Sequence, residues 1–431
     1  MKIARDSYLD QVKKFMHNGL VKVITGIRRC GKSYFLFDIF CDYLRGQGVD
    51  SSQIIEIRLD EDEFEQLRNP RKLSEYVRAR LLADGRQMYV LIDEIQECKP
   101  VDGDSVTFYD VLNTLMKKAD VYVTGSNSEM LSEDIATNFR DRGTIIRMWP
   151  LSFAEYYQIG GKEKVDAWED FLVWGGMPLA VLSPDQSSRE TYLKNLFKWV
   201  YFADIVERYS LKNDVALGAV CDVMASAVGG LTNAKRISDT LTTTASLSTC
   251  PQTVARYFDI FCHSFLFEKA SRYDVKGRKY LEGSAKYYCV DTGLRNARLN
   301  FRQIERPHLM ENVIYCELLR RGYSVDVGVV RSIEKDAGGK SVRKEFEIDF
   351  VVNCGFRRVY IQSALNIDDH EKLENEVRPF RKSGDFFRRL VVTGGNGRLW
   401  QNDEGVVFVG VIPFLLDSRI VMGDIYNANG L

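Results

Sequence analysis

The stretch VKVITGIRRCGKS, residues 21–33, decides how this chain folds. Residues 21–24 form an apolar run that predicts a short buried strand, and residues 34–46 carry apolar side chains at helical spacing. The loop between them fits the pattern G-x-x-x-x-G-K-[ST], a phosphate-binding loop (P-loop), with its fixed positions at Gly26, Gly31, Lys32 and Ser33. A chance match on a glycine-containing turn is the alternative, and the flanking strand and helix speak against it.

A loop of this kind points backbone N–H groups at phosphate oxygens, and the following helix offers its positive end to the same anion. Lys32 is expected to reach the β- and γ-phosphates of ATP, and the Ser33 hydroxyl to ligate Mg²⁺. The predicted nucleotide-binding residues in this stretch are Gly26, Arg29, Cys30, Gly31, Lys32, Ser33 and Tyr34.

A second apolar strand, residues 88–92, ends in the acidic pair Asp93-Glu94. Beside a P-loop, the first carboxylate can hold Mg²⁺ and the second can act as general base on the attacking water. The alternative is an acidic pair that the dipole of a following helix favours. Strands that alternate with helices predict an α/β domain with a mostly parallel, helix-covered sheet.

The next strand, residues 121–124, is followed by Gly125-Ser126-Asn127-Ser128, whose side chains could contact the γ-phosphate or cap a helix. Further on, Arg140 and Arg142 precede a strand at residues 144–148. An arginine here could stabilise transition-state charge, in cis or in trans, or could be solvated near a turn.

Composition sets broad limits on function. The chain has 431 residues, which predicts two to four domains, and its 45% hydrophobic and 28% charged residues are typical of a globular protein. A formal net charge of -1 gives no sign of wholesale nucleic-acid coating. Nine cysteines without a C-x-x-C pair, and four histidines of which none pairs with cysteines at metal-ligand spacing, favour reduced thiols over disulfides or a zinc site. No signal region and no apolar run near ~20 residues is found, so we expect a cytoplasmic protein without membrane contact.

Residues 26–178 resemble the AAA-type ATPases of bacteria and archaea that carry a C-terminal domain of unknown function. The matching pieces are TGIRRCGKS, LIDEIQ, TGSNSEML, RDRG, WPLSFAEYY and WGGMP. The resemblance implies that Asp93 and Glu94 are the Walker B pair and that Asn127 or Ser126 is the sensor. It also implies that Arg142 or Arg140 is an arginine finger, and that Pro178 lies near the adenine.

The middle of the chain predicts a helical lid and a winged helix. Aromatic residues at helical spacing over 189–209 indicate a packed helix. Two short helices at 235–241 and 251–262, followed by strands at 265–270 and 287–290, predict a winged helix. Its second helix and its wing, which carries Arg272, Lys276, Arg278 and Lys279, could bind DNA. A purely structural module that senses the ATPase is the alternative.

The last third resembles a PD-(D/E)XK nuclease core with a degenerate site. Glu311, Asp349 and Gln362 occupy the acidic positions, and Ala364 stands where a lysine is expected. Because that lysine commonly positions the nucleophile, we expect no nuclease activity. The polar residues 334–344 are expected to form a mobile loop, and residues 413–416 an apolar turn.

These observations predict a P-loop ATPase domain (1–160), a helical lid (161–212), a winged helix (213–299) and a nuclease-like α/β domain (300–431). The predicted function is a Mg²⁺-dependent ATPase that couples nucleotide state to domain movement. The alternatives are a slow nucleotide switch that assembles partners and an ATP-gated nuclease. Candidate partners besides ATP are DNA, through the winged helix or the last domain, a second copy of the chain, or another protein.

Overall fold

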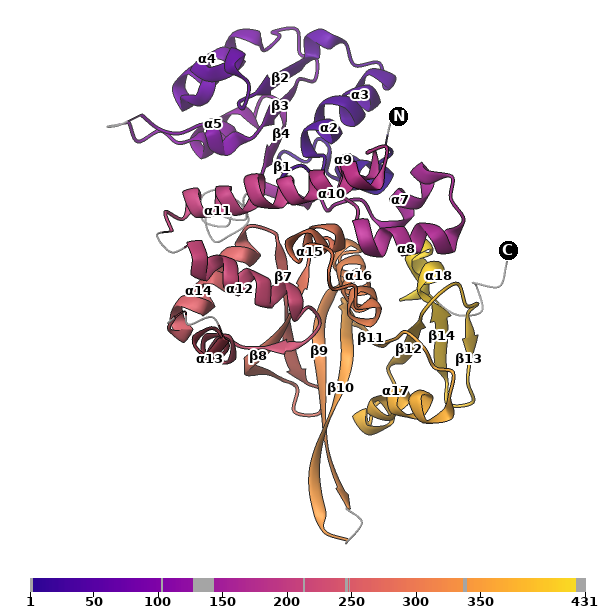
Figure 1. The fold of residues 1–431 in the computed structure, drawn as a ribbon. Helices are drawn as coiled ribbons and strands as arrows, with labels where there is room; N and C mark the ends of the chain where they lie inside the picture. Colours follow the sequence, from indigo (N-terminus) through magenta and orange to yellow (C-terminus); the bar gives the residue numbers. More distant parts are fainter. Residues whose placement is uncertain are drawn as a thin grey trace. The chain divides into compact units, whose positions relative to one another are not determined.

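A computed structural model of the chain describes residues 3–101, 104–126, 143–211, 214–244, 247, 249–335 and 339–423. The chain divides into two compact units (Figure 1). The first comprises Met1–Pro150 and His263–Phe265, and the second comprises Leu151–Cys262 and Leu266–Leu431. Within the described ranges, no helix has the length and hydropathy needed to traverse a lipid bilayer.

The first unit is built on a five-stranded, all-parallel sheet in the order β2-β3-β4-β1-β5. Its strands are β1 (Val21–Thr25), β2 (Ile54–Arg58), β3 (Tyr89–Asp93), β4 (Asp120–Gly125) and β5 (Gly143–Arg147). Every residue of β1, β3 and β4 is buried, as expected for parallel strands that are covered on both faces. This sheet confirms the α/β class predicted for the P-loop domain.

The helices of the first unit include one long run after the P-loop, in which a π-helical segment joins two α-helical ones. That run consists of α2 (Lys32–Tyr34), the π-segment Phe35–Phe40 and α3 (Cys41–Gly46). The other α-helices are α1 (Asp6–Phe15), α4 (Pro70–Arg80) and α5 (Phe108–Leu115), and 3-10 turns cover Ser51–Gln53, Asp62–Arg68 and Ile95–Glu97. The apolar faces of α4 and α5 pack on the sheet in one core with β1 to β4.

The second unit contains a nine-stranded mixed sheet in the order β13-β14-β12-β11-β10-β9-β7-β8-β6. Its strands are β6 (Leu231–Thr232), β7 (Phe267–Asp274), β8 (Lys279–Cys289), β9 (Ser324–Lys335), β10 (Ser341–Cys354), β11 (Arg357–Ala364), β12 (Arg388–Thr393), β13 (Trp400–Gln401) and β14 (Val406–Gly410). The β7–β8 hairpin expected in the wing pairs in parallel with β9 at Arg272–Asp274. One sheet therefore spans the stretches assigned to the winged-helix and nuclease-like domains, whose separate identities stay predictions.

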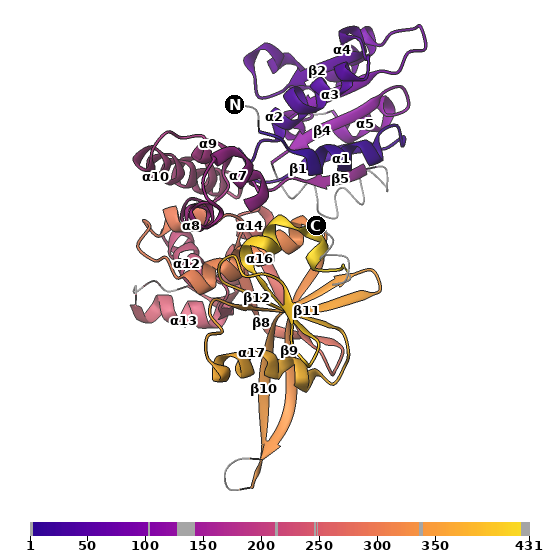
Figure 2. The ribbon, with the colours of Figure 1, turned by 90° about the vertical axis from the view of Figure 1, so that its right-hand side faces the viewer.

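The helices of the second unit begin with α7 (Phe153–Gly160) and continue through the chain. They are α8 (Lys164–Trp174), α9 (Pro178–Val181), α10 (Gln186–Asn195), the π-segment Leu196–Phe202, α11 (Ala203–Arg208), α12 (Asp214–Ser226), α13 (Ala234–Thr244), α14 (Pro251–His263), α15 (Thr292–Arg298), α16 (Arg306–Arg320), α17 (His370–Ser383), α18 (Val411–Leu416) and the 3-10 turn Ser418–Ile420. Helices α16 and α17 cover opposite faces of the sheet (Figure 2). Phe350 packs near Tyr315 of α16, whereas its neighbour Val351 shares a core with Phe380 of α17, because successive strand side chains point to opposite faces.

Two expectations about the second unit were wrong. Residues 334–344 are not a loop throughout, because β9 continues to Lys335 and β10 begins at Ser341. Together they form a long two-stranded ribbon that is solvent-exposed near its tip, where apolar alternation is absent from the sequence. Residues 413–416 lie in helix α18 instead of an apolar turn.

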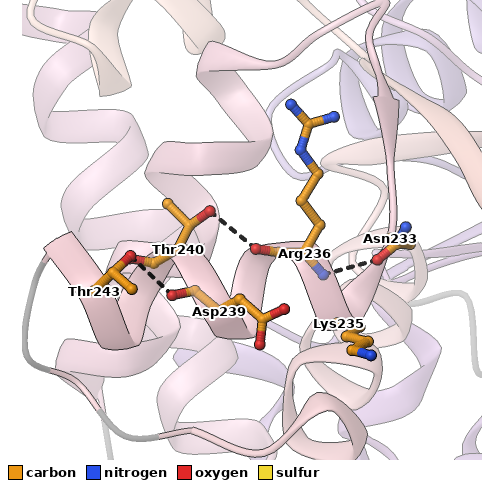
Figure 3. A pocket seen from close by; sticks show the side chains of 6 residues that line it. All are labelled: Asn233, Lys235, Arg236, Asp239, Thr240 and Thr243. Atoms are coloured by element: carbon orange, nitrogen blue, oxygen red, sulfur yellow. Dashed lines mark hydrogen bonds between the residues drawn. The ribbon is translucent and has the colours of Figure 1, made fainter.

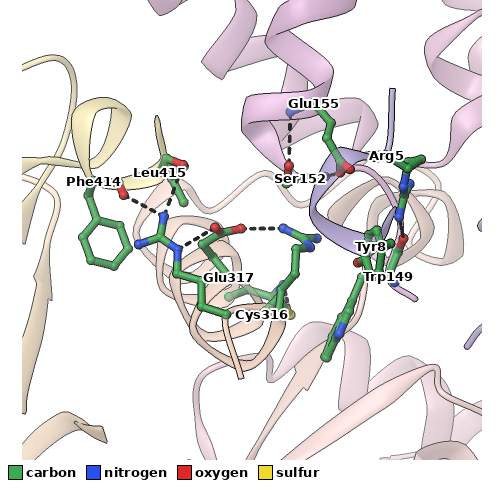
Figure 4. Close-up of polar contacts among 12 residues, drawn as sticks. Arg5, Tyr8, Trp149, Ser152, Glu155, Cys316, Glu317, Phe414 and Leu415 are labelled. Carbon is green, nitrogen blue, oxygen red and sulfur yellow. Dashed lines mark hydrogen bonds and ion pairs between the residues drawn. The ribbon is translucent and has the colours of Figure 1, made fainter. Parts of the chain in front are cut away.

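Two of the sequence pieces that carried the family resemblance have structural roles. Ser152 and Glu155 of the PLSF-x-E piece form a capping box that begins α7: the Ser152 N–H donates to the Glu155 carboxylate at 2.8 Å, and the Glu155 N–H donates to the Ser152 hydroxyl at 3.1 Å (Figure 4). Buried Asp291 accepts hydrogen bonds from the N–H groups of Gly176 (2.6 Å) and Leu294 (2.9 Å). Asp291 thus joins the WGGMP and VDTGL segments.

Candidate functional site

The loop between β1 and α2 has a backbone conformation that requires glycine at two of its positions, Gly26 and Gly31. Gly26 has a φ of 147°, and a Cβ added there would lie 2.1 Å from the Met148 carbonyl oxygen. Gly31 has a φ of 102° and Arg29 a φ of 61°, so the chain turns through left-handed conformations inside the loop. Such turns expose consecutive N–H groups to an anion. Cys30 is buried, with its thiol directed at the Met148 carbonyl oxygen at 3.8 Å.

Lys32 lies inside this loop and is 4% exposed. Its ammonium donates to the carbonyl oxygens of Gly26 (3.1 Å) and Ile27 (3.3 Å). Both acceptors are neutral, so these bonds orient the ammonium without cancelling its charge. Tyr34 follows two residues later, and its buried hydroxyl has no hydrogen-bond partner among the described residues.

Asp93 ends β3 and is 2% exposed. Its carboxylate accepts a hydrogen bond from the Thr124 hydroxyl, and the Ser33 hydroxyl lies near it. Burial raises the pKa of Asp93 above its usual value, and the two hydroxyls oppose that shift. The structure therefore brings together the two predicted Mg²⁺ ligands, Ser33 and Asp93. Hydroxyl and carboxylate oxygens are the hard donors that Mg²⁺ prefers, so these residues fit the ion.

Glu94 has a left-handed backbone, with a φ of 48°, and its N–H donates to the Thr124 hydroxyl at 2.9 Å. Its carboxylate accepts from the Gln96 amide and from the Ser126 hydroxyl, the latter at 3.1 Å. Ser126 in turn accepts from the Arg28 guanidinium of the P-loop at 3.3 Å. A chain of hydrogen bonds thus links the loop to Glu94.

Thr124, Gln96 and Arg28 were not singled out from the sequence. Thr124 is decisive, because one hydroxyl donates to Asp93 and accepts from the Glu94 N–H. The signal that could have identified it is strand order: β4 lies between β1 and β3, so its last residues face both the loop and the acidic pair.

Four predicted residues of this site are not described by the structure, and a fifth belongs to the other unit. Asn127, Ser128, Arg140 and Arg142 lie outside the described residues. Pro178 belongs to the second unit, where it is the first residue of α9 after Gly175-Gly176-Met177.

Two of the residues predicted for a degenerate nuclease-like site, Glu311 and Asp349, lie around a lysine from another strand. Lys286 of β8 forms ion pairs with Glu311 at 2.9 Å, Glu347 at 2.7 Å and Asp349 at 3.8 Å. Burial lowers the pKa of Lys286, but the three carboxylates raise it by more than burial lowers it. The net pKa is therefore above the usual value for lysine, and the ammonium stays charged. Burial raises the pKa of Asp349 to about 8, with the Glu311 charge adding to the shift and Lys286 opposing it.

Gln362, the third predicted residue, lies on β11 and forms a hydrogen bond with the backbone of Asp349. Its side-chain oxygen accepts from the Asp349 N–H at 2.7 Å, and its amide donates to Glu376 at 3.1 Å. Among the described residues, no group of three or more His, Cys, Asp or Glu side chains is arranged to hold a metal ion. Lys286 and the carboxylates of Glu311, Glu347 and Asp349 line a cavity of about 630 Å³.

A shallower cavity of about 380 Å³ lies on α13, the first helix of the predicted winged helix (Figure 3). Its polar groups bond within the helix: Asn233 accepts from the Arg236 N–H at 2.8 Å, and the hydroxyls of Thr240 and Thr243 donate to carbonyls one turn earlier. The Arg236 guanidinium points away from Asp239 (Figure 3). Because these polar groups are already hydrogen-bonded to the helix backbone, few of them are available to bind a ligand in this cavity.

The comparisons with known proteins agree with the P-loop geometry. Residues 18–157 match the model of an AAA domain, and residues 165–305 match a domain of unknown function, DUF8612. An uncharacterized protein of Haemophilus influenzae is 31% identical over 423 residues, covering 96% of this chain and 98% of its own. An uncharacterized protein of Methanocaldococcus jannaschii is 25% identical, covering 89% and 83%.

A solved structure of the Aeropyrum pernix Orc1 protein in complex with DNA aligns with 70% of this chain and 93% of its own at 12% identity. The TM-score of that alignment is 0.29, so the AAA assignment rests on the domain match and the loop geometry.

Proposed function

This chain belongs to the family of AAA-domain proteins that its Haemophilus influenzae relative represents, and we propose that it binds ATP with Mg²⁺ at the 26–33 loop and hydrolyses it. The observation that carries the proposal is the buried Asp93 carboxylate at the end of β3, which is hydrogen-bonded to Thr124 and lies near the Ser33 hydroxyl, together with a P-loop lysine whose partners are neutral. Hard oxygen donors and an uncompensated ammonium meet at one edge of a parallel sheet, as phosphoryl transfer requires.

Each residue has a distinct task in this mechanism. The N–H groups of the loop and Lys32 bind the phosphates, and Ser33 with Asp93 holds the metal. Bound Mg²⁺ supplies neutralisation of the charge on the β- and γ-phosphate oxygens. Glu94 takes the proton of the attacking water, and Thr124 and Ser126 orient Glu94. Asn127 as sensor, Arg142 or Arg140 as arginine finger and Pro178 at the adenine complete the proposal.

A slow nucleotide switch is the second candidate function. It is supported by the Glu94 carboxylate, which is engaged by the Gln96 amide and the Ser126 hydroxyl. If Glu94 must break two hydrogen bonds before it can accept a proton, the protein hydrolyses ATP slowly. Whether ATP occupies the site then matters more than the rate of hydrolysis. Coupling to a partner protein or to DNA would be read from the second unit.

Nucleotide binding and steady-state hydrolysis by the wild type and four variants test both candidates. Lys32→Ala is expected to lose ATP binding, whereas Lys72→Ala, an exposed lysine on α4, keeps it. Glu94→Gln is expected to bind ATP but to lose about 10²- to 10⁴-fold in kcat, the usual contribution of a general base. Its control is Glu97→Gln. Full activity in Glu94→Gln would show that another group is the base.

Adding duplex and single-stranded DNA at several salt concentrations separates the two candidates. A rate that DNA raises, and that added salt returns to its basal value, favours an ATPase that acts on DNA. A slow rate that DNA leaves unchanged favours the switch.

A further inference from the structure

Two turns at one end of the nine-stranded sheet each expose a phenylalanine ring. Gly355-Phe356 connects β10 to β11, and Phe386-Phe387 precedes β12. Because β11 and β12 pair in parallel, with Val359 opposite Arg388, both turns lie at the same sheet end. Phe356 is 93% exposed and Phe386 is 100% exposed. Turn tips normally carry small or polar residues, and grouped exposed rings mark interaction surfaces.

The arginines that follow these rings keep their charge. The triplet Phe-Arg-Arg occurs at 356–358 and again at 387–389. Arg357 donates to the Met422 carbonyl oxygen at 3.2 Å, Arg358 to the Asn353 side-chain oxygen at 2.9 Å, and Arg389 to the Asp385 carbonyl oxygen at 2.6 Å. These acceptors are all neutral. No described carboxylate forms an ion pair with any of the three guanidinium groups.

Flat groups continue across the sheet from these turns. The Arg358 guanidinium lies 5.3 Å from the Phe387 ring centroid and 5.2 Å from that of Tyr273. Tyr280, which is 62% exposed, packs edge-on against Tyr273 at 5.5 Å. The row therefore runs from β12 to the β7–β8 hairpin.

We propose that this Phe-Arg surface, formed by Phe356, Arg357, Arg358, Phe386, Phe387 and Arg389, binds single-stranded nucleic acid. Exposed rings give unpaired bases a stacking partner, and guanidinium groups that form no ion pair with a described carboxylate bind phosphates. A duplex stacks its bases on one another and offers them no such contact. The proposal is independent of ATP binding, because all of these residues belong to the second unit.

Fluorescence anisotropy of a labelled 20-nucleotide oligothymidylate, measured with the full chain at increasing salt, tests the proposal. The double variant Phe356→Ser/Phe386→Ser is expected to bind at least about ten-fold more weakly with an unchanged salt slope, because stacking is lost while phosphate contacts remain. Arg357→Gln/Arg358→Gln is expected to weaken binding and to reduce the slope of log K against log salt by about 0.7 per lost contact.

Trp199→Ser is the matched control, since Trp199 is 64% exposed and carries a neighbouring Lys198 at 4.5 Å on another surface of the same unit. It should bind as the wild type does, and thermal unfolding should show that all variants are folded. Unchanged affinity in the phenylalanine variant, or an equal loss in Trp199→Ser, overturns the proposal. Equally tight binding of a matched duplex overturns it, and so does a phenylalanine variant that alters only self-association.

Discussion

Each unit of this protein holds a group of acidic side chains that the sequence predicted to be a site, on or beside strands, and these two groups are held in opposite ways. In the first unit, Asp93 and Glu94 are held by hydroxyl and amide donors, which carry no charge. In the second, Glu311, Glu347 and Asp349 converge on the Lys286 ammonium. Neutral donors orient a carboxylate and leave its charge for an incoming cation, whereas an internal ammonium already occupies the cation position. Acidic residues alone therefore do not define a metal site; the charge of their partners decides.

The largest effect is expected from Lys286→Met. Removing one member of a buried ion-pair cluster leaves uncompensated charge, which costs about 3–5 kcal/mol of unfolding free energy. Urea unfolding followed by circular dichroism measures the loss. Lys344→Met is the control, because its half-exposed pair with Glu334 is worth at most about 1 kcal/mol. Mg²⁺ can take the place of the lost ammonium, so adding it should raise the unfolding free energy of Lys286→Met and leave that of the wild type unchanged. If Mg²⁺ does not stabilise Lys286→Met, the ammonium does not occupy a cation position.

A smaller effect is expected from Thr124→Val in the first unit. The valine keeps the shape of the side chain but removes the hydroxyl that donates to Asp93 and accepts from the Glu94 N–H. Hydrogen bonds to charged groups are worth about 1.5–3 kcal/mol, so kcat should fall about 10- to 100-fold. Steady-state hydrolysis at saturating ATP is the measurement, with Thr114→Val on α5 as the control. Normal kcat in Thr124→Val would show that the hydroxyl does not position the acidic pair.

The smallest effect concerns pH and Asp349. Its pKa is raised to about 8 in the folded protein, above the unfolded value, so the folded state binds the extra proton between about pH 4 and 8. The contribution of Asp349 to stability is therefore greatest at low pH and is lost as the pH rises through 8. Asp349→Asn should remove a slope of at most about 1.4 kcal/mol per pH unit from the unfolding free energy between pH 5 and 7.5. Urea titrations at three pH values, with Asp368→Asn as control, would detect it, and an unchanged slope would assign the titration to another group.

The sequence was most informative where chemistry depends on close spacing. The P-loop and the Asp93-Glu94 pair are local patterns, and the strand and helix that flank the loop are short and strongly apolar. Thr124 could not be identified in the same way, because its role follows from β4 lying between β1 and β3. Lys286 could not be identified from spacing either. The sequence pattern places a lysine at position 364, where the chain has Ala364, whereas Lys286 lies on β8, far from that position in the sequence.

The ribbon formed by β9 and β10 shows a different limit. Near its tip, β9 alternates exposed and half-exposed residues and β10 is exposed from Ser341 to Glu345, so neither strand has the buried apolar face that identifies a strand. Backbone pairing from Ser341 with Lys335 through Lys344 with Ser332 forms the ladder there. Strands that pair with each other away from a hydrophobic core need no apolar alternation, so their sequences do not identify them as strands.

The strand order of the large sheet also has a consequence for synthesis of the chain on the ribosome. β7 and β8 emerge before β9, whose first residue is Ser324 and which pairs with the other edge of β7. Until then β7 presents unpaired N–H and C=O groups, a template for association between nascent chains. A fragment that stops at residue 299, the predicted end of the winged helix, would keep that edge permanently, and we expect it to aggregate.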